Sequence, residues 1–553
     1  MRKIFPALAA ALVCCLSCVE TEYGIGGNFI PENLKYTMVT NQKVFLDVDN
    51  SPTDSLSGYS SNWVTIGAIR DEDLGLTTRA SVLYLMPLSD TLDFGKDPVF
   101  KRMHLSIALD SVNVADESQR NILQSVNVYS LKETVDPRYD YDCNADFKDK
   151  VDWDRSIVRN SPVINGKDSL SLDFTKEYAS QFLSLTQDDL SDISKYKKKI
   201  KGFYVNTDIP GDNSGRINMF HLQLGYDSAY LTGNFAKLDI RSTFNGVEKD
   251  SSYFFYLSPS KMFNVDSLLY NTAAGNLPQY ALNLTSQDSR KSEKVKGSLC
   301  VEGGGGLKPH ILAKSLKDQV RSIIESNGHN PDKVTLTKAS LSFYYDAPDE
   351  TYEGLKLFPI MLSPTVRMHG VDTTGGVSTK KVIYDGISDS SSSSENQGDI
   401  NYSRQCYAPD ITYHLQALLS ADDSAIERGD YDIWLLIMAY RTIVTESSSS
   451  EMSDYYSALA YQQYYNNMYG GYGGYGYGGY GYGGYGGYGY DPYSNYYSYM
   501  MMANMYSDPS SSTSVSLELD KDRFYKALLC GKDHPDESRR PKLVFSYIIP
   551  NSY

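Results

Sequence analysis

Short stretches in which apolar and polar residues alternate run through this chain, and they constrain its fold more than any other feature. In "HLSIALDSV", Leu105, Ile107 and Leu109 alternate with polar or small residues. A period of two places every second side chain on the same face, as in a strand with one buried face. Similar stretches follow at "QSVNVYSL", "KGFYVNTDI" and "INMFHLQLGY". The sequence therefore predicts a mainly β protein.

Two segments have the pattern of a short helix instead. "DFTKEYASQFLSL" begins with an N-cap at Asp173 or Thr175. In "LAKSLKDQVRSIIESNG" an apolar face is followed by Asn327-Gly328, a typical helix end. The residues expected on that face are Leu312, Leu316, Val320 and Ile324.

The second half of the chain repeats the pattern of the first. "HLSIALDSV" and "SVNVYSL" are echoed by "KASLSFYYDAP" and "LKLFPIML", and "LDFTKEYASQFLS" is echoed by "PDITYHLQALLS". "KGFYV" is echoed by "YDIWLLIM" and "INMFHLQL" by "PKLVFSYI". "SVSLELDKDRFYKALL" matches the strand-and-helix piece about as well. The repeat predicts two related β-sandwich (jelly-roll-like) lobes with a few short helices.

Residues Gly470–Tyr490 consist only of glycine and tyrosine. They lie between "DIWLLIMAYRTIV" and "SVSLELDKDRF", two predicted strands, so we expect an insertion (446–512) in a loop of the second lobe. The tract has no aliphatic residue to build a core, which predicts disorder. Three roles are open for it: a neutral expansion, an adhesive arm of tyrosines, or an element at a membrane interface.

The N-terminus predicts export. "MRKIFPALAAALVCCLSC" has a basic start and an apolar run that is too short to span a bilayer, as in a signal peptide (1–17). Ser17 before Cys18 resembles the lipobox of bacterial lipoproteins, which implies acylation of Cys18, palmitate being one such group. Cys15 is a competing position, and a plain secreted protein is the alternative. Two or three acyl chains would anchor the protein stably.

The remaining boundaries follow from composition. Residues 18–60 are polar and turn-rich, which predicts a tether with at most one strand, "QKVFLDV". We expect the first lobe over 61–245 and the second over 334–553. Between them, residues 246–333 are expected to form a connecting region that contains a helix and the glycine cluster Gly303–Gly306. That cluster lacks the Gly-Lys-Ser/Thr of a phosphate-binding loop, so we interpret it as a tight turn between the lobes.

One acidic loop has part of a calcium-binding pattern. In "DYDCNADFKDKVD" oxygen-bearing residues alternate, but Ala145 and Val151 stand where a calcium loop needs glycine and glutamate. A solvated acidic loop is therefore the preferred interpretation, and Ca²⁺ is the one cofactor that the sequence leaves open. The candidate ligands are Asp140, Asp142, Asn144 and Asp146.

No catalytic residue is predicted. The seven histidines are scattered, and no nucleophile elbow is present. The cysteines outside the signal allow three disulfide pairings, with free buried thiols as the alternative: Cys143, Cys300, Cys406 and Cys530.

Asp-Ser or Asp-Thr followed by an apolar residue or threonine recurs along the chain. This pattern resembles the O-glycosylation acceptor of exported Bacteroidetes proteins, although Asp-Ser is also common turn chemistry. The candidate sites are Ser55, Thr91, Ser111, Ser169, Ser228, Ser267, Thr373 and Ser424.

The net charge of −16 argues against nucleic acid or an acidic membrane surface as the main partner. The densest basic run, "KYKKK" at Lys195–Lys199, is interpreted as a solvated loop or helix end.

The lipobox, Glu20 and Glu22 after it, "YGIGGNFIPENLKYTMV", "VTIGAIRDEDLGLTTRASVLYLMPL", "GGGG" and "RPKLVFSYI" resemble a family of Bacteroidetes outer-membrane lipoproteins with a domain of unknown function. The resemblance covers about residues 18–548. It implies a lipid-anchored, two-lobed protein of the outer membrane that faces the cell surface.

The function expected from these features is that of a non-enzymatic surface module that binds a β-barrel protein or a glycan. An accessory subunit of an outer-membrane assembly or export machine is one alternative. A polysaccharide hydrolase is another.

Overall fold

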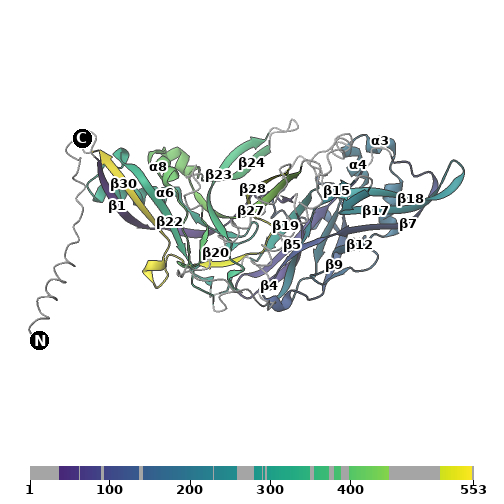
Figure 1. The fold of residues 1–553 in the computed structure, drawn as a ribbon, viewed down its shortest axis with the longest axis horizontal. Helices are drawn as coiled ribbons and strands as arrows, with labels where there is room; N and C mark the ends of the chain where they lie inside the picture. Colours follow the sequence, from purple (N-terminus) through teal and green to yellow (C-terminus); the bar gives the residue numbers. More distant parts are fainter. Residues whose placement is uncertain are drawn as a thin grey trace, which may run out of the picture.

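Two hydrophobic cores organise the chain, one in each of two lobes. The computed structural model describes residues 36–60, 63–88, 92–135, 141–227, 230–257, 279–288, 291–292, 295–348, 354–372, 379–387, 398–446 and 511–550. Cys18 and the Gly/Tyr tract lie outside these ranges. The described chain is mainly β, as predicted, and its sheets are antiparallel (Figure 1).

Lobe 1 is a sandwich of two sheets, on the right of Figure 1. The larger sheet has the order β10 (Val151–Ser156), β9 (Gln124–Leu131), β13 (Phe203–Thr207), β5 (Gly75–Leu83), β4 (Trp63–Asp71), β14 (Ser214–His221), β8 (Leu109–Asn113), with β3 (Tyr59–Ser60), β11 (Val163–Ile164) and β19 (Ala281–Gln287) at its side. The smaller sheet has the order β12 (Leu170–Asp173), β7 (Lys96–Ile107), β17 (Phe235–Phe244), β18 (Val247–Leu257), β6 (Leu85–Pro87).

The alternation in "HLSIALDSV" has the predicted effect only in part. Leu105 and Ile107 of β7 point into the core, as expected for a strand with one buried face. The chain then crosses to the other sheet at Ala108, where β8 pairs with β14 instead of continuing β7. One predicted strand is therefore two strands in different sheets.

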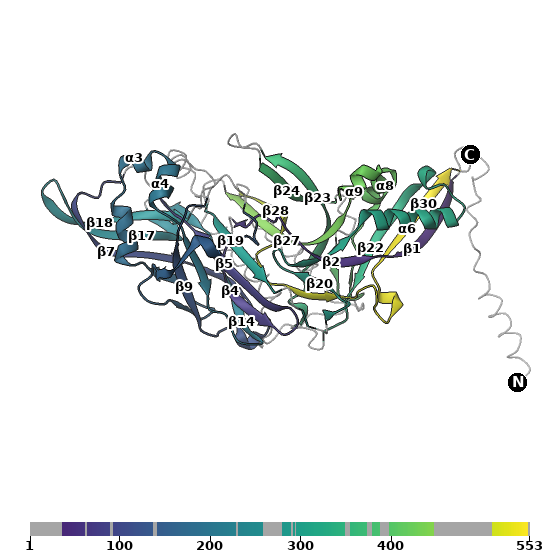
Figure 2. The ribbon, with the colours of Figure 1, turned by 180° about the vertical axis from the view of Figure 1, so that it is seen from behind.

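Lobe 2, on the left of Figure 1 and the right of Figure 2, is also a two-sheet sandwich. One sheet has the order β1 (Tyr36–Phe45), β30 (Lys542–Pro550), β22 (Thr335–Tyr344), β26 (Cys406–Tyr407), β25 (Ile400–Asn401). The other has the order β2 (Val48–Pro52), β21 (Leu307–Ile311), β27 (Ile433–Glu446), β23 (Met361–Asp372), β24 (Thr379–Gly386), with β28 (Ser511–Leu519) beside β27.

Short elements complete the two lobes. Two further ladders join β15 (Leu224–Asp227) to β16 (Tyr230–Gly233) and β20 (Leu299–Glu302) to β29 (Lys526–Leu529). The helices are α2 (Lys176–Leu183), α3 (Gln187–Leu190), α4 (Ile193–Lys199), α6 (Ala313–Ser326), α8 (Thr412–Ser420) and α9 (Asp423–Glu427), with single turns η3 (Glu117–Gln119), η4 (Lys148–Lys150), η6 (Pro331–Lys333) and η8 (Glu537–Arg539). Among the described residues, no helix is long and apolar enough to cross a membrane.

Both predicted helices form. Thr175 caps α2, since its hydroxyl accepts the backbone N–H of Tyr178 at 3.3 Å. Helix α6 buries Leu316, Val320 and Ile324 and ends before Gly328, whose φ is +80°. Leu312 was expected on the same face but is 47% exposed, because it precedes the first turn and Ala313 fills the position.

Strand pairing relates the two lobes. In lobe 1, β7 lies between β12 and β17 and contacts α2; in lobe 2, β22 lies between β26 and β30 and contacts α8. The pair β9–β13 corresponds in the same way to β23–β27. Most of the predicted counterparts occupy corresponding places, but "LKLFPIML" reaches β23 only with Met361 and Leu362. The last pair does not correspond, because β30 takes the place of β17 rather than of β14. The alternative copy, "SVSLELDKDRFYKALL", is not a strand and helix, since it forms strands β28 and β29.

The prediction of a tether over 18–60 is wrong for the described part from Tyr36 onward. Strand β1 pairs along its length with β30, from Tyr36↔Pro550 to Phe45↔Lys542, and β2 pairs with β21. Val44, Leu46 and Val48 contribute to the core of lobe 2. The segment has few apolar residues, but they stand at every second position and so share one face. An edge strand needs no more than one apolar face.

The connecting region predicted over 246–333 is not a separate unit. Strands β18 and β19 belong to lobe 1, whereas β20, β21 and α6 belong to lobe 2. The described part of the chain thus begins in lobe 2 with β1, builds lobe 1 and returns to lobe 2 between β19 and β20. The insertion that carries the Gly/Tyr tract follows β27 and precedes β28, which pair up to Glu446↔Ser511. It therefore connects two paired strands of lobe 2, as expected.

The glycine cluster lies at the junction of the lobes, as predicted. The Arg79 guanidinium of lobe 1 lies against Gly303 and Gly304, and a Cβ at position 303 would lie 2.0 Å from the carbonyl oxygen of Arg523. Buried Lys308 donates to the carbonyls of Gly304 and Gly306 at 3.1 and 3.2 Å. Burial lowers the pKa of Lys308 to about 7. Glycine is required here because backbone and cationic side chains approach it closely.

Candidate functional site

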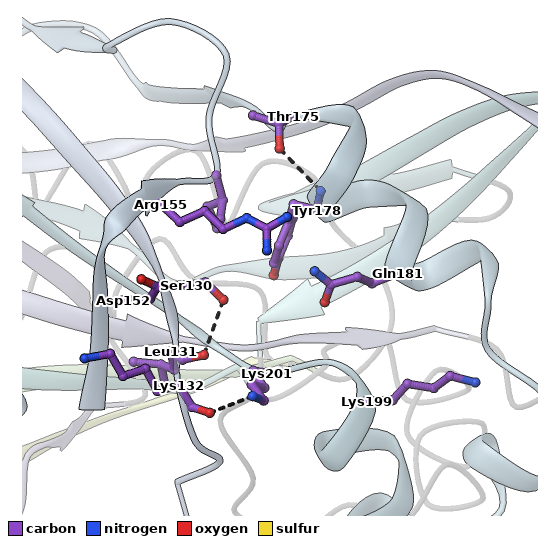
Figure 3. A pocket seen from close by; sticks show the side chains of 11 residues that line it. Ser130, Leu131, Lys132, Asp152, Arg155, Thr175, Tyr178, Gln181, Lys199 and Lys201 are labelled. Carbon is purple, nitrogen blue, oxygen red and sulfur yellow. Dashed lines mark hydrogen bonds between the residues drawn. The ribbon is translucent and has the colours of Figure 1, made fainter. Parts of the chain in front are cut away.

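A polar cavity of about 400 Å³ opens in lobe 1 where the larger sheet meets the helices (Figure 3). Three segments far apart in the sequence form it: the ends of β9 and β10, helix α2, and the segment from the end of α4 to the start of β13. Its lining residues are Ser130, Leu131, Lys132, Asp152, Arg155, Ile157, Thr175, Tyr178, Gln181, Lys199 and Lys201.

Local structure explains how the helices reach the cavity. The Thr175 cap fixes the first turn of α2, which places Tyr178 and Gln181 one turn apart on the same side. Helix α4 is capped by Asp192 and ends at Lys199, so the basic run "KYKKK" is a helix end as predicted. It is not fully solvated, however. Lys197 is buried, with its ammonium 4.6 Å from the centre of the Tyr84 ring.

The Tyr178 hydroxyl is the most unusual group of the cavity. The side chain is 2% exposed, and its hydroxyl has no hydrogen-bond partner in the structure. In Figure 3 the side chains of Arg155 and Gln181 lie on either side of its ring. Burial raises the pKa of Tyr178 well above its usual range, so the hydroxyl stays protonated and can donate. A buried polar group without a partner costs about 1–3 kcal/mol, which a ligand that accepts its hydrogen bond would recover.

Positive charge dominates the rim. Lys199 is neutralised by Asp189 at 2.7 Å, whereas Lys201 donates to the carbonyl of Lys132 at 2.6 Å. Within the described part of the chain, no carboxylate forms an ion pair with Lys132, Arg155 or Lys201. Asp152 is the single carboxylate of the lining. In a protein of net charge −16 this local excess of cations favours an anionic ligand.

The same strands also carry an aromatic group. Trp153 is 41% exposed and contacts Tyr129 and Tyr204 edge-on, at centroid distances of 5.2 and 5.5 Å. Tyr129 and Tyr204 are directly opposite each other on β9 and β13. The indole N–H of Trp153 donates to the carbonyl of Lys148 at 2.9 Å, which fixes the ring. Fixed, partly exposed aromatic rings suit the apolar faces of sugar rings.

The candidate calcium loop is described except for Asp140. Asp142 and Asp146 are both exposed, and the Asp146 carboxylate accepts the backbone N–H of Lys148 at 2.9 Å. The Asn144 amide donates to the carbonyl of Gly305 at 3.4 Å, in the junction between the lobes. Among described histidine, cysteine and acidic side chains, those of this loop do not form a group of three that could hold a metal ion. Calcium binding by this loop and a solvated acidic loop both stay predictions.

The other predicted site residues are scattered. Ser169 and Ser424 are exposed, Ser55 and Ser111 are half-buried, and the candidates Thr91, Ser228, Ser267 and Thr373 lie outside the described residues. Glycosylation stays a prediction at all of them. The cysteines outside the signal are free and buried in the structure, as in the alternative of free buried thiols: Cys143, Cys300, Cys406 and Cys530.

Sequence reasoning missed the cavity. The one sequence signal of its positive charge was the basic run Lys195–Lys199, and of the residues in this run only Lys199 contributes to the lining. Tyr178 fits the buried face of an amphipathic helix equally well, so its sequence position does not distinguish a core residue from a ligand-binding one. The residues around it outside α2 come from segments about 20 to 50 positions before it and about 20 positions after it along the chain.

Comparison with protein-family models, curated proteins and solved structures finds no match to this chain. The resemblance to the lipoprotein family therefore remains a prediction. The geometry of lobe 1 carries the functional argument instead.

Proposed function

We propose that this protein is a lipid-anchored surface module of the outer membrane that binds an anionic saccharide in the cavity of lobe 1. The observation that carries the proposal is the buried hydroxyl of Tyr178, which has no hydrogen-bond partner among the described residues, beside Arg155, which forms no ion pair with a described carboxylate. A sugar carboxylate or sulfate would accept from the guanidinium, and a sugar oxygen would accept from the hydroxyl. A volume of about 400 Å³ is within the range of small-molecule sites.

Two further features support a saccharide. Ser130, Thr175 and Gln181 supply neutral hydroxyl and amide groups, which match the hydroxyls of a sugar. The partly exposed Trp153 of β10 offers a stacking surface for a second part of a longer saccharide chain. A non-enzymatic role is favoured because Asp152 is the single carboxylate of the lining, whereas glycoside hydrolysis usually needs two.

The proposed anchor orients the lobes. Cys18 precedes the start of β1 at Tyr36 by 18 residues (36 − 18), a segment that spans roughly 60 Å at most. Because β1 and β30 lie in lobe 2, an acylated Cys18 would keep lobe 2 close to the membrane. The cavity, in the opposite lobe, would then be the part that faces a ligand outside the cell.

The test is binding of the full chain, purified in mild detergent, to polygalacturonate, chondroitin sulfate and neutral dextran by calorimetry. We expect both anionic polymers to bind, dextran not to bind, and salt to weaken the binding. Arg155→Gln should reduce the affinity at least about tenfold, or about 1.4 kcal/mol. The control is Arg241→Gln, since Arg241 is exposed, pairs with Asp250 and lies outside the cavity.

Equal binding by Arg155→Gln and the unsubstituted protein would contradict the cavity as the site. The accessory-subunit alternative has its own outcome: a pull-down from the outer membrane that yields a stoichiometric β-barrel protein, while none of the saccharides binds. Replacement of Cys18 by alanine should release the protein from the membrane. Retention of this variant would overturn the anchor.

A further inference from the structure

A second cluster of reactive side chains lies in lobe 2, far along the sequence from the cavity. Asp346 follows β22, while Cys530 and His534 follow β29. One ligand atom from each lies within 4.8 Å of the other two. The His534 Nε2 is 3.1 Å from Asp346 Oδ2, and the Cys530 Sγ is 3.9 Å from Asp346 Oδ1.

These distances are close to those in a metal site. Around a tetrahedral zinc ion, with bonds of about 2.0–2.3 Å, neighbouring ligand atoms are roughly 3.3–3.8 Å apart. Imidazole, thiolate and carboxylate are also the three ligand types that zinc uses in proteins. Small side-chain movements would therefore bring the three atoms onto one ion.

The surroundings have the form of an outer ligand shell. The His534 Nδ1 lies 3.1 Å from the Asp536 carbonyl oxygen and 3.2 Å from the Asp536 backbone nitrogen, and these two contacts hold the ring in place. In the tautomer that carries its proton on Nδ1, the ring donates to the carbonyl and Nε2 is left for a metal. Arg539 Nε lies 3.0 Å from Asp346 Oδ1, so Oδ2 would be the carboxylate oxygen that binds the ion. The backbone N–H of Cys530 donates to the Tyr344 carbonyl at 2.7 Å, which fixes the thiol beside β22.

Access and burial also fit a metal ion. The Asp346 side chain is 65% exposed, which provides an entry path, whereas Cys530 is buried. A thiol binds a metal ion as a thiolate, so binding would release the Cys530 proton to the solvent. Without a metal, the same groups form an ion pair between His534, when protonated, and Asp346.

We propose that Asp346, Cys530 and His534 form a binding site for Zn²⁺ or a similar divalent transition metal, with a fourth position open to water. The site would fasten the segment after β29 to the end of β22. It uses residues of lobe 2 alone and does not depend on the saccharide proposal.

The experiment is titration of the reduced, metal-free full chain with Co²⁺, a spectroscopic substitute for zinc. We expect one equivalent to bind, with a thiolate-to-cobalt charge-transfer band and the intense visible bands of tetrahedral cobalt, and Zn²⁺ to displace it. Cys530→Ser should remove the charge-transfer band. Cys143→Ser, a change of a buried thiol in lobe 1, should leave it unchanged.

Variants of the two less buried ligands, His534 and Asp346, keep the test decisive if Cys530→Ser does not fold. Zn²⁺ should raise the melting temperature of the unsubstituted protein but not of His534→Gln or Asp346→Asn, whose folding is checked by circular dichroism. No charge-transfer band in the unsubstituted protein, or an unchanged band in Cys530→Ser, would overturn the proposal. So would equal stabilisation of His534→Gln by Zn²⁺.

Discussion

The guanidinium of Arg79 in lobe 1 donates to the backbone carbonyl of Arg523 in lobe 2 at 3.2 Å, across the glycine cluster. Burial lowers the pKa of Arg79, although Asp520, Asp522 and Glu302 nearby oppose the effect. Asp522 in turn accepts from Asn283 of lobe 1 at 2.9 Å. The two sandwiches are thus joined by buried polar groups that form hydrogen bonds across the junction.

Gly303→Ala should disturb this junction. The new methyl group would meet the Arg523 carbonyl at 2.0 Å, and we expect a loss of about 1–3 kcal/mol in the free energy of unfolding, measured in urea. The matched control is Gly211→Ala, where the nearest atom would be 3.9 Å away. Equal stability of the two variants would mean that the lobes do not pack closely at the cluster.

Tyr178→Phe should separate ligand binding from stability. Because the Tyr178 hydroxyl is buried without a partner, its removal should leave the free energy of unfolding unchanged or raise it by up to about 1 kcal/mol. Affinity for an anionic saccharide should fall in the same variant. If stability falls by more than about 1 kcal/mol, the hydroxyl has a structural partner and the argument for the cavity weakens.

Acid should destabilise lobe 2 through His414. Burial lowers the pKa of His414 to about 4, while its Nε2 lies 3.1 Å from the Tyr431 carbonyl. The unfolded chain, with the ordinary histidine pKa near 6.5, binds a proton that the folded protein excludes. Stability should therefore fall as the pH drops from about 6.5 to about 4, by at most about 1.4 kcal/mol per pH unit from this group.

The check on His414 is denaturant unfolding at several pH values. The stability difference between the unsubstituted protein and His414→Gln should change across this window. The control variant is His221→Gln, since His221 is an exposed histidine. A flat difference for His414→Gln would show that the imidazole is accessible to protons in the folded state.

The four thiols should be unreactive in the folded protein. Cys143, Cys300, Cys406 and Cys530 are free and buried, so an aromatic disulfide reagent should modify them slowly under native conditions. After unfolding in denaturant without a reductant, all four should react. Reaction of two or fewer thiols after unfolding would indicate a disulfide, the alternative that the sequence leaves open.

The sequence by itself determined the local features of this protein. The period of two in "HLSIALDSV" and "SVNVYSL" identifies strands and their buried faces, and the cap at Thr175 with the stop at Asn327-Gly328 locates two helices. These signals are readable because they depend on neighbouring residues and on one buried face. The glycine cluster was predicted as a tight turn between the lobes, because a run of glycines is itself a local signal.

Only the tertiary structure decided which distant segments meet. The period of two does not specify partners, so it could not predict that β1 pairs with β30, or that the chain changes sheets at Ala108. Tyr178 and Arg155 converge on one cavity, as do Asp346 and His534 on one cluster, only after the sheets pack. Hydrophobic burial is non-directional and fixes which faces are covered, whereas strand register and core packing fix which polar groups come together.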